Sequence, residues 1–422
     1  MDDTAVPVVV SAGANHTAVL MFPANRSGSC GGCSDVGGGG VYTWGQGEDG
    51  QLGHRSNNDV HYPVEVEALQ GVDVTAIVCG ASHTIAVSNT TKETFAWGWG
   101  DFGRLGHGDP GDRLYPTPIA ALSGITVQHV ACGDSHCMVV ADDGKLFTFG
   151  RNQNGQLGLG DTHDRLKPEL VTVLADAGRP VLVKKAAGGA EHSAITVEGG
   201  GMYTFGWGRY GNLGHGDVED LHVPTKVEGL KGVTVTDPIC GWRHSAALTD
   251  EGRLWTFGWS KYGQLGHGDN VDHWTPKLLP KFAGGPITAA AGGWRHMCAL
   301  AGSTGTLYSW GWNQFGQLGI GTMDDANTPQ HVDVDVDVVG GGGVAPKVRS
   351  VACGWRHTIV IAGDDNRVYT WGRCVNGQLG HGDTTQQINP KKVQALDLLR
   401  QGIGLPVTMT GGSGGASAGA ER

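Results

Sequence analysis

The chain has 422 residues, of which 73 are glycine, and its formal net charge is −11. About 17% glycine is far above the usual ~7%, but there is no Gly-X-Y period, so a collagen triple helix is excluded. Apolar residues make up 39% of the chain and 13 residues are tryptophan, which argues against global disorder.

The acidic balance also argues against direct DNA binding, because neutralising phosphates requires a basic surface. No apolar run reaches the ~20 residues that a membrane helix needs, and the start, Met1-Asp2-Asp3, lacks the basic residues of a signal peptide. The odd number of cysteines, nine, is typical of a reducing compartment. We therefore expect a protein of the cytoplasm and nucleus with no membrane association.

Two short motifs alternate along the whole chain. The first is aromatic-x-[WF]-G followed four residues later by G-x-L-G, and its seven leucines lie 52 to 61 residues apart. They are Leu52, Leu105, Leu157, Leu213, Leu265, Leu318 and Leu379. The second motif, G-x-x-H, begins at Gly13, Gly80, Gly133, Gly189, Gly241, Gly293 and Gly354. Self-similarity at such a period is the signature of a repeat architecture.

Taken in chain order, the units predict short β-strands. A strand near residues 8–11 comes first, and later runs such as 84–87 and 146–149 are bounded by Gly-rich turns. A unit of this length fits a four-stranded blade, so the sequence predicts an all-β, seven-bladed β-propeller over residues 1–396. The first strand should close the ring against the last blade. We expect inserted loops at 28–40 and 332–343 and a flexible Gly/Ser/Ala-rich tail at 397–422.

The repeat accounts for several apparent site motifs. The G-x-G-x-x-G strings at Gly45, Gly98 and Gly206 lie in repeat loops and open no helix, so they do not indicate nucleotide binding. Twelve of the 18 histidines recur once per unit, and we expect each to be hydrogen-bonded within its own blade rather than to bind metal. Cys30 and Cys33 have metal-ligand spacing but no second pair nearby. Nothing in the sequence indicates an enzyme.

Some recurring residues are expected to be structural. The cysteines that precede a G-x-x-H glycine should be small buried hydrophobes: Cys79, Cys132, Cys240 and Cys353. The tryptophans of the W-G motif alternate with phenylalanine at the same position and should lie in the core: Trp44, Trp97, Trp310 and Trp371.

Three units differ from the rest. Their variable G-x-x-H pair is Trp-Arg, namely Trp242-Arg243, Trp294-Arg295 and Trp355-Arg356. Equivalent loops of adjacent blades are neighbours on one face of a propeller, so these six side chains should form one cluster. Exposed aromatic and Arg clusters are common anchors of interfaces.

The charges of the W-G loops complement this cluster. Units one and two are acidic, with Glu48, Asp49, Asp101 and, further on, Asp112, whereas units four and five are basic. A face that is acidic on one side and basic on the other matches itself about a two-fold axis. We expect a homodimer held mainly by Arg–carboxylate pairs. Indole absorbs near-ultraviolet light and donates electrons when excited, which suggests a light switch that needs no bound cofactor.

The seven units resemble regulator-of-chromosome-condensation repeats. The three G-W-R-H motifs, together with Trp99 in WGWGDFGRLGHG, closely resemble the plant and algal UV-B photoreceptors of this repeat family. The resemblance implies a homodimer in the dark that UV-B splits into monomers. It further implies that the monomer binds an E3 ubiquitin ligase of the constitutively photomorphogenic type to alter transcription, and that feedback repressor proteins restore the dimer.

The resemblance also implies roles for individual residues. Trp242 and Trp294 would be the principal chromophores, Trp355 an auxiliary one, and Trp99 would complete the cluster across the dimer. The implied ion pairs join Arg295 to Asp101 and Asp112 of the second copy, Arg356 to Asp49, Arg373 to Glu48 and Arg151 to Glu191, with Arg243 near the sensing pair. Trp207, Trp259 and Trp312 would harvest light.

The C-terminal segment departs from the family, whose members carry a Val-Pro pair there to engage the ligase. This chain offers only Leu405-Pro406-Val407. Two alternative functions stay open. One is a guanine-nucleotide exchange factor for a small nuclear GTPase, although the chain lacks a basic N-terminal tail. The other is a propeller scaffold without photochemistry, which would not need Trp at all three Trp-Arg sites.

Overall fold

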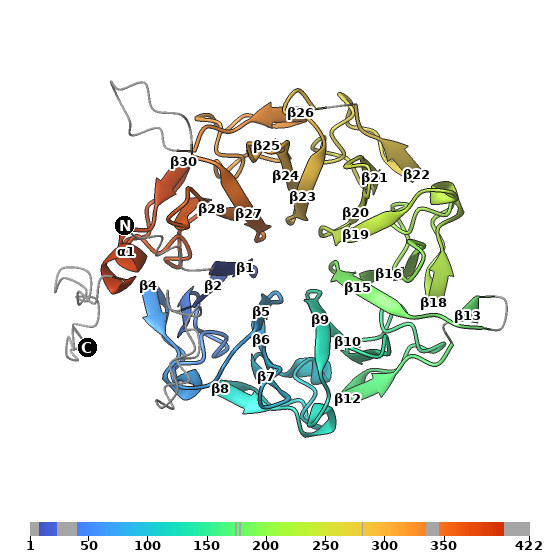
Figure 1. Cartoon of the computed structure of the whole chain (residues 1–422), viewed down its shortest axis with the longest axis horizontal. Coiled ribbons are helices and arrows are strands. Elements are labelled where there is room, and N and C mark those ends of the chain that lie inside the picture. The colour runs from blue at the N-terminus through green and yellow to red at the C-terminus, as the bar shows by residue number, and fades with distance from the viewer. Residues whose placement is uncertain are drawn as a thin grey trace, which may run out of the picture.

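The computed structural model describes residues 8–22, 40–173, 175–176, 179–280, 282–334 and 346–400. Within these residues the chain forms seven four-stranded antiparallel sheets arranged as blades around a central axis (Figure 1). The predicted all-β, seven-bladed propeller is therefore confirmed. No helix of the described residues is long and apolar enough to cross a membrane.

Each blade is a simple meander whose first strand is innermost, and the blades are numbered here in chain order (Figure 1). Blade 1 contains β1 (Val8–Ala12), β2 (His16–Met21), β3 (Gly40–Gly45) and β4 (Val60–Glu65); blade 2 contains β5 (Ala76–Cys79), β6 (His83–Ser88), β7 (Glu93–Gly98) and β8 (Arg113–Pro118). Blade 3 contains β9 (Val127–Cys132), β10 (His136–Ala141), β11 (Leu146–Gly150) and β12 (Arg165–Leu170); blade 4 contains β15 (Val183–Gly188), β16 (His192–Val197), β17 (Met202–Gly206) and β18 (Leu221–Lys226). Blade 5 contains β19 (Val235–Cys240), β20 (His244–Thr249), β21 (Leu254–Gly258) and β22 (His273–Leu278). Blade 6 contains β23 (Ile287–Gly292), β24 (His296–Ala301), β25 (Thr306–Gly311) and β26 (Ala326–His331); blade 7 contains β27 (Val348–Cys353), β28 (His357–Ala362), β29 (Arg367–Gly372) and β30 (Gln387–Lys392).

Smaller elements connect or flank the blades. A two-stranded ribbon of β13 (Ala175–Asp176) and β14 (Arg179–Pro180) follows blade 3, and the helix α1 (Gln394–Arg400) follows blade 7. Single 3-10 turns lie at Glu67–Leu69, Asp101–Gly103, Ala120–Leu122 and Glu228–Leu230. The helix α1 extends across the expected domain boundary at residue 396, and its Leu396 is buried against blades 1 and 7.

The second strand of every blade is buried along its whole length. Each such strand is covered on both faces, because its blade packs between two others. This is why these strands are nearly continuous runs of apolar and small residues, as in HTIAVS of β6, rather than alternating sequences. Short apolar runs of this kind predicted the strands correctly at 84–87 and 146–149.

The hydrophobic core is divided into seven clusters, one between each pair of adjacent blades. Every cluster contains the Trp or Phe of the repeat, which is fully buried: Trp44, Trp97, Phe149, Phe205, Phe257, Trp310 and Trp371. Each of the four tryptophans donates its Nε1–H to a backbone carbonyl of the neighbouring blade, such as Trp310 to Gln264 at 2.9 Å. The expectation that these four are structural is confirmed.

The ring closes between blades 7 and 1. The strand β1 packs against β27 and β28, as the sequence predicted for the N-terminal strand. Val10 and Trp44 of blade 1 share a cluster with Ile359 of blade 7. The Thr17 hydroxyl bonds to the His357 ring at 3.0 Å, so polar contacts also join the two blades.

The histidines of the G-x-x-H motif correct one prediction. They do not bond within their own blade: each Nε2 faces the next blade, as when His192 meets the Ser245 hydroxyl at 2.9 Å. Six of the seven make such a bond. The exception is His244, because Met297 occupies the position of the hydroxyl, and both of its buried ring nitrogens lack a hydrogen-bond partner. The histidines that follow the Leu-Gly pair do bond within their own blade, as predicted.

Several expectations fall outside the described residues. These are Cys30 and Cys33 with most of the insertion at 28–40, residues 335–343 of the second insertion, and the tail from 401 onward with Leu405-Pro406-Val407. The second insertion begins inside the fold, because Val332 and Val334 are buried between blades 6 and 7.

Candidate functional site

Two loops of each blade meet on one face of the ring. In blade 6 these are the turn that carries Trp294 and Arg295 and the loop that begins at Trp312. The Trp312 amide donates to the Arg295 carbonyl oxygen at 2.8 Å, and an equivalent bond recurs in all seven blades. Gly311 has a φ of 106°, and a Cβ there would lie 2.5 Å from the same oxygen, so glycine is needed for this approach.

Trp294 lies at the centre of an aromatic cluster. Its ring centroid is 5.3 Å from Trp242, 5.5 Å from Trp312 and 5.7 Å from Trp355. The Trp355 ring stacks on it at an interplanar angle of 17°, whereas the other two meet it edge-on. Trp259 joins through Trp242 at 5.7 Å. The structure thus brings five of the predicted site tryptophans together.

The arginines of the same turns cover these rings. The guanidinium carbon of Arg295 is 3.8 Å from the Trp294 ring centroid, and that of Arg243 is 3.8 Å from Trp242. The guanidinium of Arg356 covers Trp294 from 4.5 Å. These are cation–π distances, so Trp294 has two positive charges against its ring.

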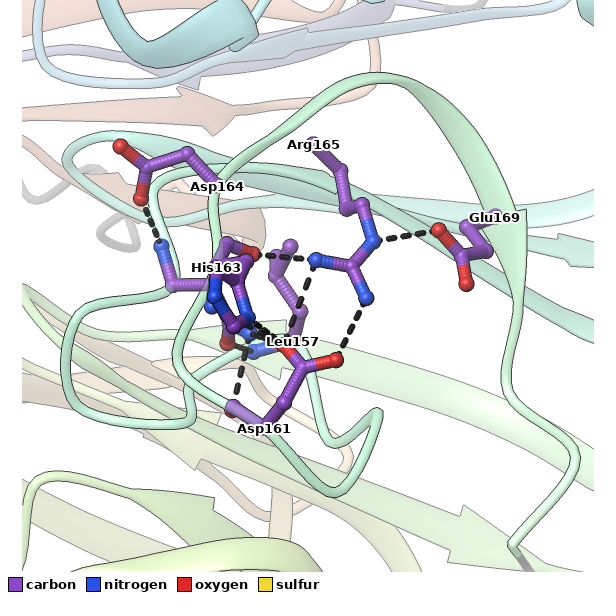
Figure 2. A network of polar contacts seen from close by, with 7 residues as sticks. Leu157, Asp161, His163, Asp164, Arg165 and Glu169 are labelled. Atoms are coloured by element: carbon purple, nitrogen blue, oxygen red, sulfur yellow. Dashed lines mark hydrogen bonds and ion pairs between the residues drawn. The ribbon is translucent and has the colours of Figure 1, made fainter.

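The arginines of the cluster have no counter-ion among the residues that the structure describes. Among the described residues, none of the four that lie over blades 5 to 7 makes an ion pair: Arg243, Arg295, Arg356 and Arg373. Arg165 of blade 3 shows the contrast, since Figure 2 shows it held between Asp161, at 2.7 Å, and Glu169. Burial and the neighbouring Arg243 lower the pKa of Arg295, while Tyr262 opposes them. The cluster therefore carries uncompensated positive charge.

The acidic residues lie on blades 1 and 2. Blade 1 is next to blade 7, whereas blade 2 is at the bottom of Figure 1 and blade 6 is at the top. The acidic residues are Glu48, Asp49, Asp101 and Asp112, and none of them makes an ion pair with another described residue. Burial, and then the carboxylates of Asp112 and Glu48, raise the pKa of Asp49 against a hydrogen bond from Ser82. Arg104 is a cation that opposes this shift without forming an ion pair with Asp49, so the sector is acidic overall.

Asp112 also has a structural role that the sequence analysis missed. Its Oδ1 accepts a hydrogen bond from the Gly100 amide at 2.8 Å, which anchors the W-G loop of blade 2. The same anchor recurs in six blades, twelve residues after the amide that it holds. Figure 2 shows the copy in blade 3, where Asp164 accepts from the Asn152 amide at 2.7 Å. Asp112 keeps its other carboxylate oxygen for a further contact.

Arg151 and Glu191 pair within the chain. Arg151 of blade 3 lies 2.8 Å from Glu191 of blade 4. Both side chains are partly exposed, so the contact is available for exchange with a second copy. The sequence analysis placed these two residues together only through the dimer, and the structure shows that one chain already joins them.

Trp99 lies apart from the other predicted chromophores, in blade 2. Among the described residues it makes no ring contact with another tryptophan. Its face is covered instead by Arg104, whose guanidinium carbon is 3.9 Å from the ring centroid. Arg104 is the one Arg, Lys, Asp or Glu side chain in the described part of the chain that is buried, and burial lowers its pKa to about 10. The sequence does mark Arg104 as exceptional, because the other six G-x-L-G motifs have Gln or Asn at its position.

Asp134 is a second residue that the sequence analysis missed. It lies in blade 3 but accepts a hydrogen bond from Trp355 Nε1 of blade 7 at 3.3 Å, across the central channel. This channel encloses a cavity of about 290 Å³, which Trp242, Trp294 and Trp355 also line. Burial raises the pKa of Asp134 to about 6. The signal was the acidic residue in GDSH, where every other unit has Ala or Trp.

Two groups of soft ligands lie inside the ring, His83 with Cys132 and Cys137, and His296 with Cys298 and Cys353. In the first group the repeat explains the contact. Cys137 occupies the Ser/Thr position that receives the histidine of the preceding blade, and its thiol donates to the Arg104 carbonyl as the hydroxyls do elsewhere. All four cysteines line the channel; Cys79 and Cys240 are buried as predicted, but Cys132 and Cys353 are only partly buried.

Comparison with known proteins places the chain in a family. The model of the regulator of chromosome condensation (RCC1) repeat matches residues 38–87, 93–140, 143–196, 199–248, 251–300, 304–361 and 365–401. The first six matches each run from the third strand of one blade to the second strand of the next, so the sequence repeat is offset from the structural blade.

Two relatives and one solved structure define the similarity. The chain is 45% identical over 391 residues to the ultraviolet-B receptor UVR8 of Arabidopsis thaliana, which is 93% of this chain and 82% of that protein. It is 33% identical over 364 residues to the human E3 ubiquitin-protein ligase HERC2, but that match covers only 7% of the ligase. The crystal structure of human WBSCR16 has the same fold, with a TM-score of 0.74 at 24% identity over 84% of this chain and 93% of that one.

Proposed function

The chain belongs to the RCC1 repeat family, and within that family we propose that it functions as a UV-B photoreceptor with its own tryptophans as chromophore. The observation that carries the proposal is the environment of Trp294. This ring touches three other indoles and lies under two guanidinium groups that have no carboxylate partner among the described residues. The similarity to the Arabidopsis ultraviolet-B receptor supports the same function.

In the dark, two copies pair face to face about a two-fold axis. The basic, Trp-rich blades 5 to 7 of one copy then meet the acidic blades 1 and 2 of the other, and each interface forms twice. Arg295 pairs with Asp101 and Asp112 of the second copy, and Arg356 pairs with Asp49. Arg373 with Glu48 and Arg151 with Glu191 add two further pairs. Trp99 of blade 2 thereby completes the aromatic cluster of the second copy.

Light acts on the charge of the indole. An excited indole donates an electron readily, and a guanidinium 3.8 Å from the ring face responds to any change in the charge of that ring. Transfer of an electron from excited Trp294 to the guanidinium of Arg295 leaves a cationic ring beside a neutral Arg295, so the attraction between ring and guanidinium is lost. The ion pairs that depend on the position of Arg295 then weaken, and the dimer dissociates.

A row of other aromatic rings leads to Trp294 at the centre of the cluster. Ring contacts of 5.4 to 5.9 Å connect Trp207, Tyr210, Trp259, Tyr262 and Trp312 in that order. Trp312 contacts Trp294 directly. Rings in such contact exchange excitation readily, so Trp207, Trp259 and Trp312 act as light harvesters for the central indoles.

The monomer carries the signal to a partner. The face exposed by dissociation engages an E3 ubiquitin ligase of the constitutively photomorphogenic type, and feedback repressor proteins favour return to the dimer. Because the C-terminal segment offers Leu405-Pro406-Val407 in place of the family's Val-Pro pair, the propeller is the surface we assign to the ligase. A location in both cytoplasm and nucleus fits this role and stays a prediction.

Size-exclusion chromatography in the dark and after UV-B tests the proposal. Wild type should elute as a dimer in the dark and as a monomer after UV-B with no added cofactor, and high salt should weaken the dark dimer. Trp294→Phe should abolish the light response. Trp310→Phe of the same blade is the matched control, because Phe occupies that position in three other units. A dark elution volume that UV-B does not move, or a normal response of Trp294→Phe, contradicts the proposal.

A further inference from the structure

One position of the W-G loop is aromatic in the three blades that lead into the Trp-Arg turns, and also in blade 2, where it is Phe102. The residue before the closing glycine is Tyr210 in blade 4, Tyr262 in blade 5 and Phe315 in blade 6. Each ring lies beside the next loop tryptophan or its own, at centroid distances of 5.4 to 5.9 Å. The three residues therefore have equivalent places in the aromatic row and differ by a single hydroxyl.

That hydroxyl touches an arginine of the following blade. Arg243 NH1 donates to the Tyr210 hydroxyl at 3.3 Å, and Arg295 NH1 donates to the Tyr262 hydroxyl at 3.1 Å. The two contacts have the same sequence separation, 33 residues. The third arginine, Arg356, lies over Trp294 at 4.5 Å and faces the ring of Phe315 at 5.8 Å from its guanidinium carbon, but Phe315 offers it no hydroxyl. Its guanidinium makes no hydrogen bond to any described residue.

From this difference we propose that Tyr210 and Tyr262 are positioning residues, which hold Arg243 and Arg295 over the chromophore rings before a second copy binds. Arg356 has no such tether, and beyond its contact with the Trp294 ring it is fixed by its ion pair with the second copy. The inference rests on the proposed dimer and names how its arginines are prepared for pairing. The arginines of the site thus fall into a tethered and an untethered class.

The tether matters because an arginine side chain loses much rotamer freedom when it enters an ion pair. A guanidinium has five N–H donors, so one bond to tyrosine leaves the others for a carboxylate. A side chain that is already fixed pays less entropy on association. Arg356 is also repelled by two like charges. Burial lowers its pKa most, and the nearby guanidinium groups of Arg373 and Arg295 lower it further.

Exchanging the hydroxyl tests the inference in both directions. The dark dimer dissociation constant, measured by sedimentation at a fixed salt concentration, should rise about threefold to tenfold in Tyr262→Phe for each of the two symmetric contacts. Phe315→Tyr should lower it by tethering Arg356. Thermal unfolding of the separated monomers should be the same in both variants as in wild type, because neither change alters the packing of the ring.

A second readout does not need the dimer. Nitrogen-15 relaxation of the arginine Nε–H groups in the full chain, kept monomeric by high salt and dilution, should show Arg295 ordered in wild type and mobile in Tyr262→Phe. Equal mobility of Arg295 in the two proteins overturns the tether. If the chain never dimerises, the proposed function fails, and the relaxation experiment still decides the inference. If Arg295 becomes mobile in Tyr262→Phe while the dimer dissociation constant stays unchanged, the proposed role of the tether in pairing is overturned.

Discussion

Asp134 offers a quantitative test of the central channel. Burial raises the pKa of its carboxyl from an ordinary 3.8 to about 6. A difference of about two pKa units, at about 1.4 kcal/mol per unit, corresponds to about 3 kcal/mol. This is an upper limit, because the side chain is partly exposed to the channel. Replacing Asp134 by Asn removes the charge and keeps an oxygen that can accept from Trp355 Nε1.

The direction in which the free energy of unfolding changes with pH follows from proton linkage. The folded chain binds this proton more tightly than the unfolded chain, so the contribution of Asp134 to stability is full below pH 4 and falls as pH rises through 6. The Asn variant has no such loss. Its free energy of unfolding, relative to wild type, should therefore rise between pH 4 and pH 7.5 by up to about 3 kcal/mol.

Urea unfolding of both proteins as monomers, at high salt and at half-unit pH steps from 4 to 8, measures this difference. Asp142→Asn is the control, because Asp142 is an exposed residue of the same blade. A flat difference for Asp134→Asn, or one that falls with pH, would refute the assignment of a buried, proton-binding carboxyl at this position.

Two matched pairs of variants test other contacts. His192→Phe should cost about 1 kcal/mol more unfolding free energy than His244→Phe, because only His192 loses a hydrogen bond to the next blade; equal losses in guanidinium chloride unfolding would contradict this. Asp112→Asn should keep the loop anchor to Gly100 but weaken the dark dimer, whereas Asp164→Asn, which has the same anchor on blade 3, should leave the sedimentation of the dimer unchanged. Equal weakening by both changes would point to loop distortion instead of charge.

The fold was predictable because every unit has to fill the same kind of hydrophobic cluster between two blades. A Trp or Phe recurs before the motif glycine because it fills one cluster between blades, and the four tryptophans there are fully buried as predicted. The comparison of units also separated structural from exceptional residues. Trp294 stood out because only three of the seven turns carry Trp-Arg.

The same comparison could not show which neighbour a recurring residue touches. The histidine of each G-x-x-H turn was assigned to its own blade, but six of them bond to the next one. A contact between blades depends on how far one sheet is rotated from the next, which spacing along the chain does not contain. Met297 stands where the other units have Ser, Thr or Cys, so the sequence does show why His244 lacks a hydrogen bond. This can be read only once it is known that these histidines bond to the next blade.

Contacts across the ring were still harder to predict. Asp134 and Trp355 are 221 residues apart and come from blades 3 and 7. Their hydrogen bond exists because the channel is narrow, and the width of a channel follows from the number and tilt of the blades rather than from any motif. Arg104 was visible as an exception in its motif, but its stacking on Trp99 requires the loop conformation of blade 2.

The rigidity of the ring fits the lack of ion pairs, among the described residues, between the acidic residues of blades 1 and 2 and the arginines of blades 5 to 7. Seven clusters fix the blades relative to one another. In the proposed dimer, a second copy brings the two sectors together. An interface built mainly from ion pairs depends on the position and charge of a few side chains and is sensitive to salt. Under the proposed function, a change of charge on one indole therefore weakens this interface more than it would weaken one held by extensive apolar burial.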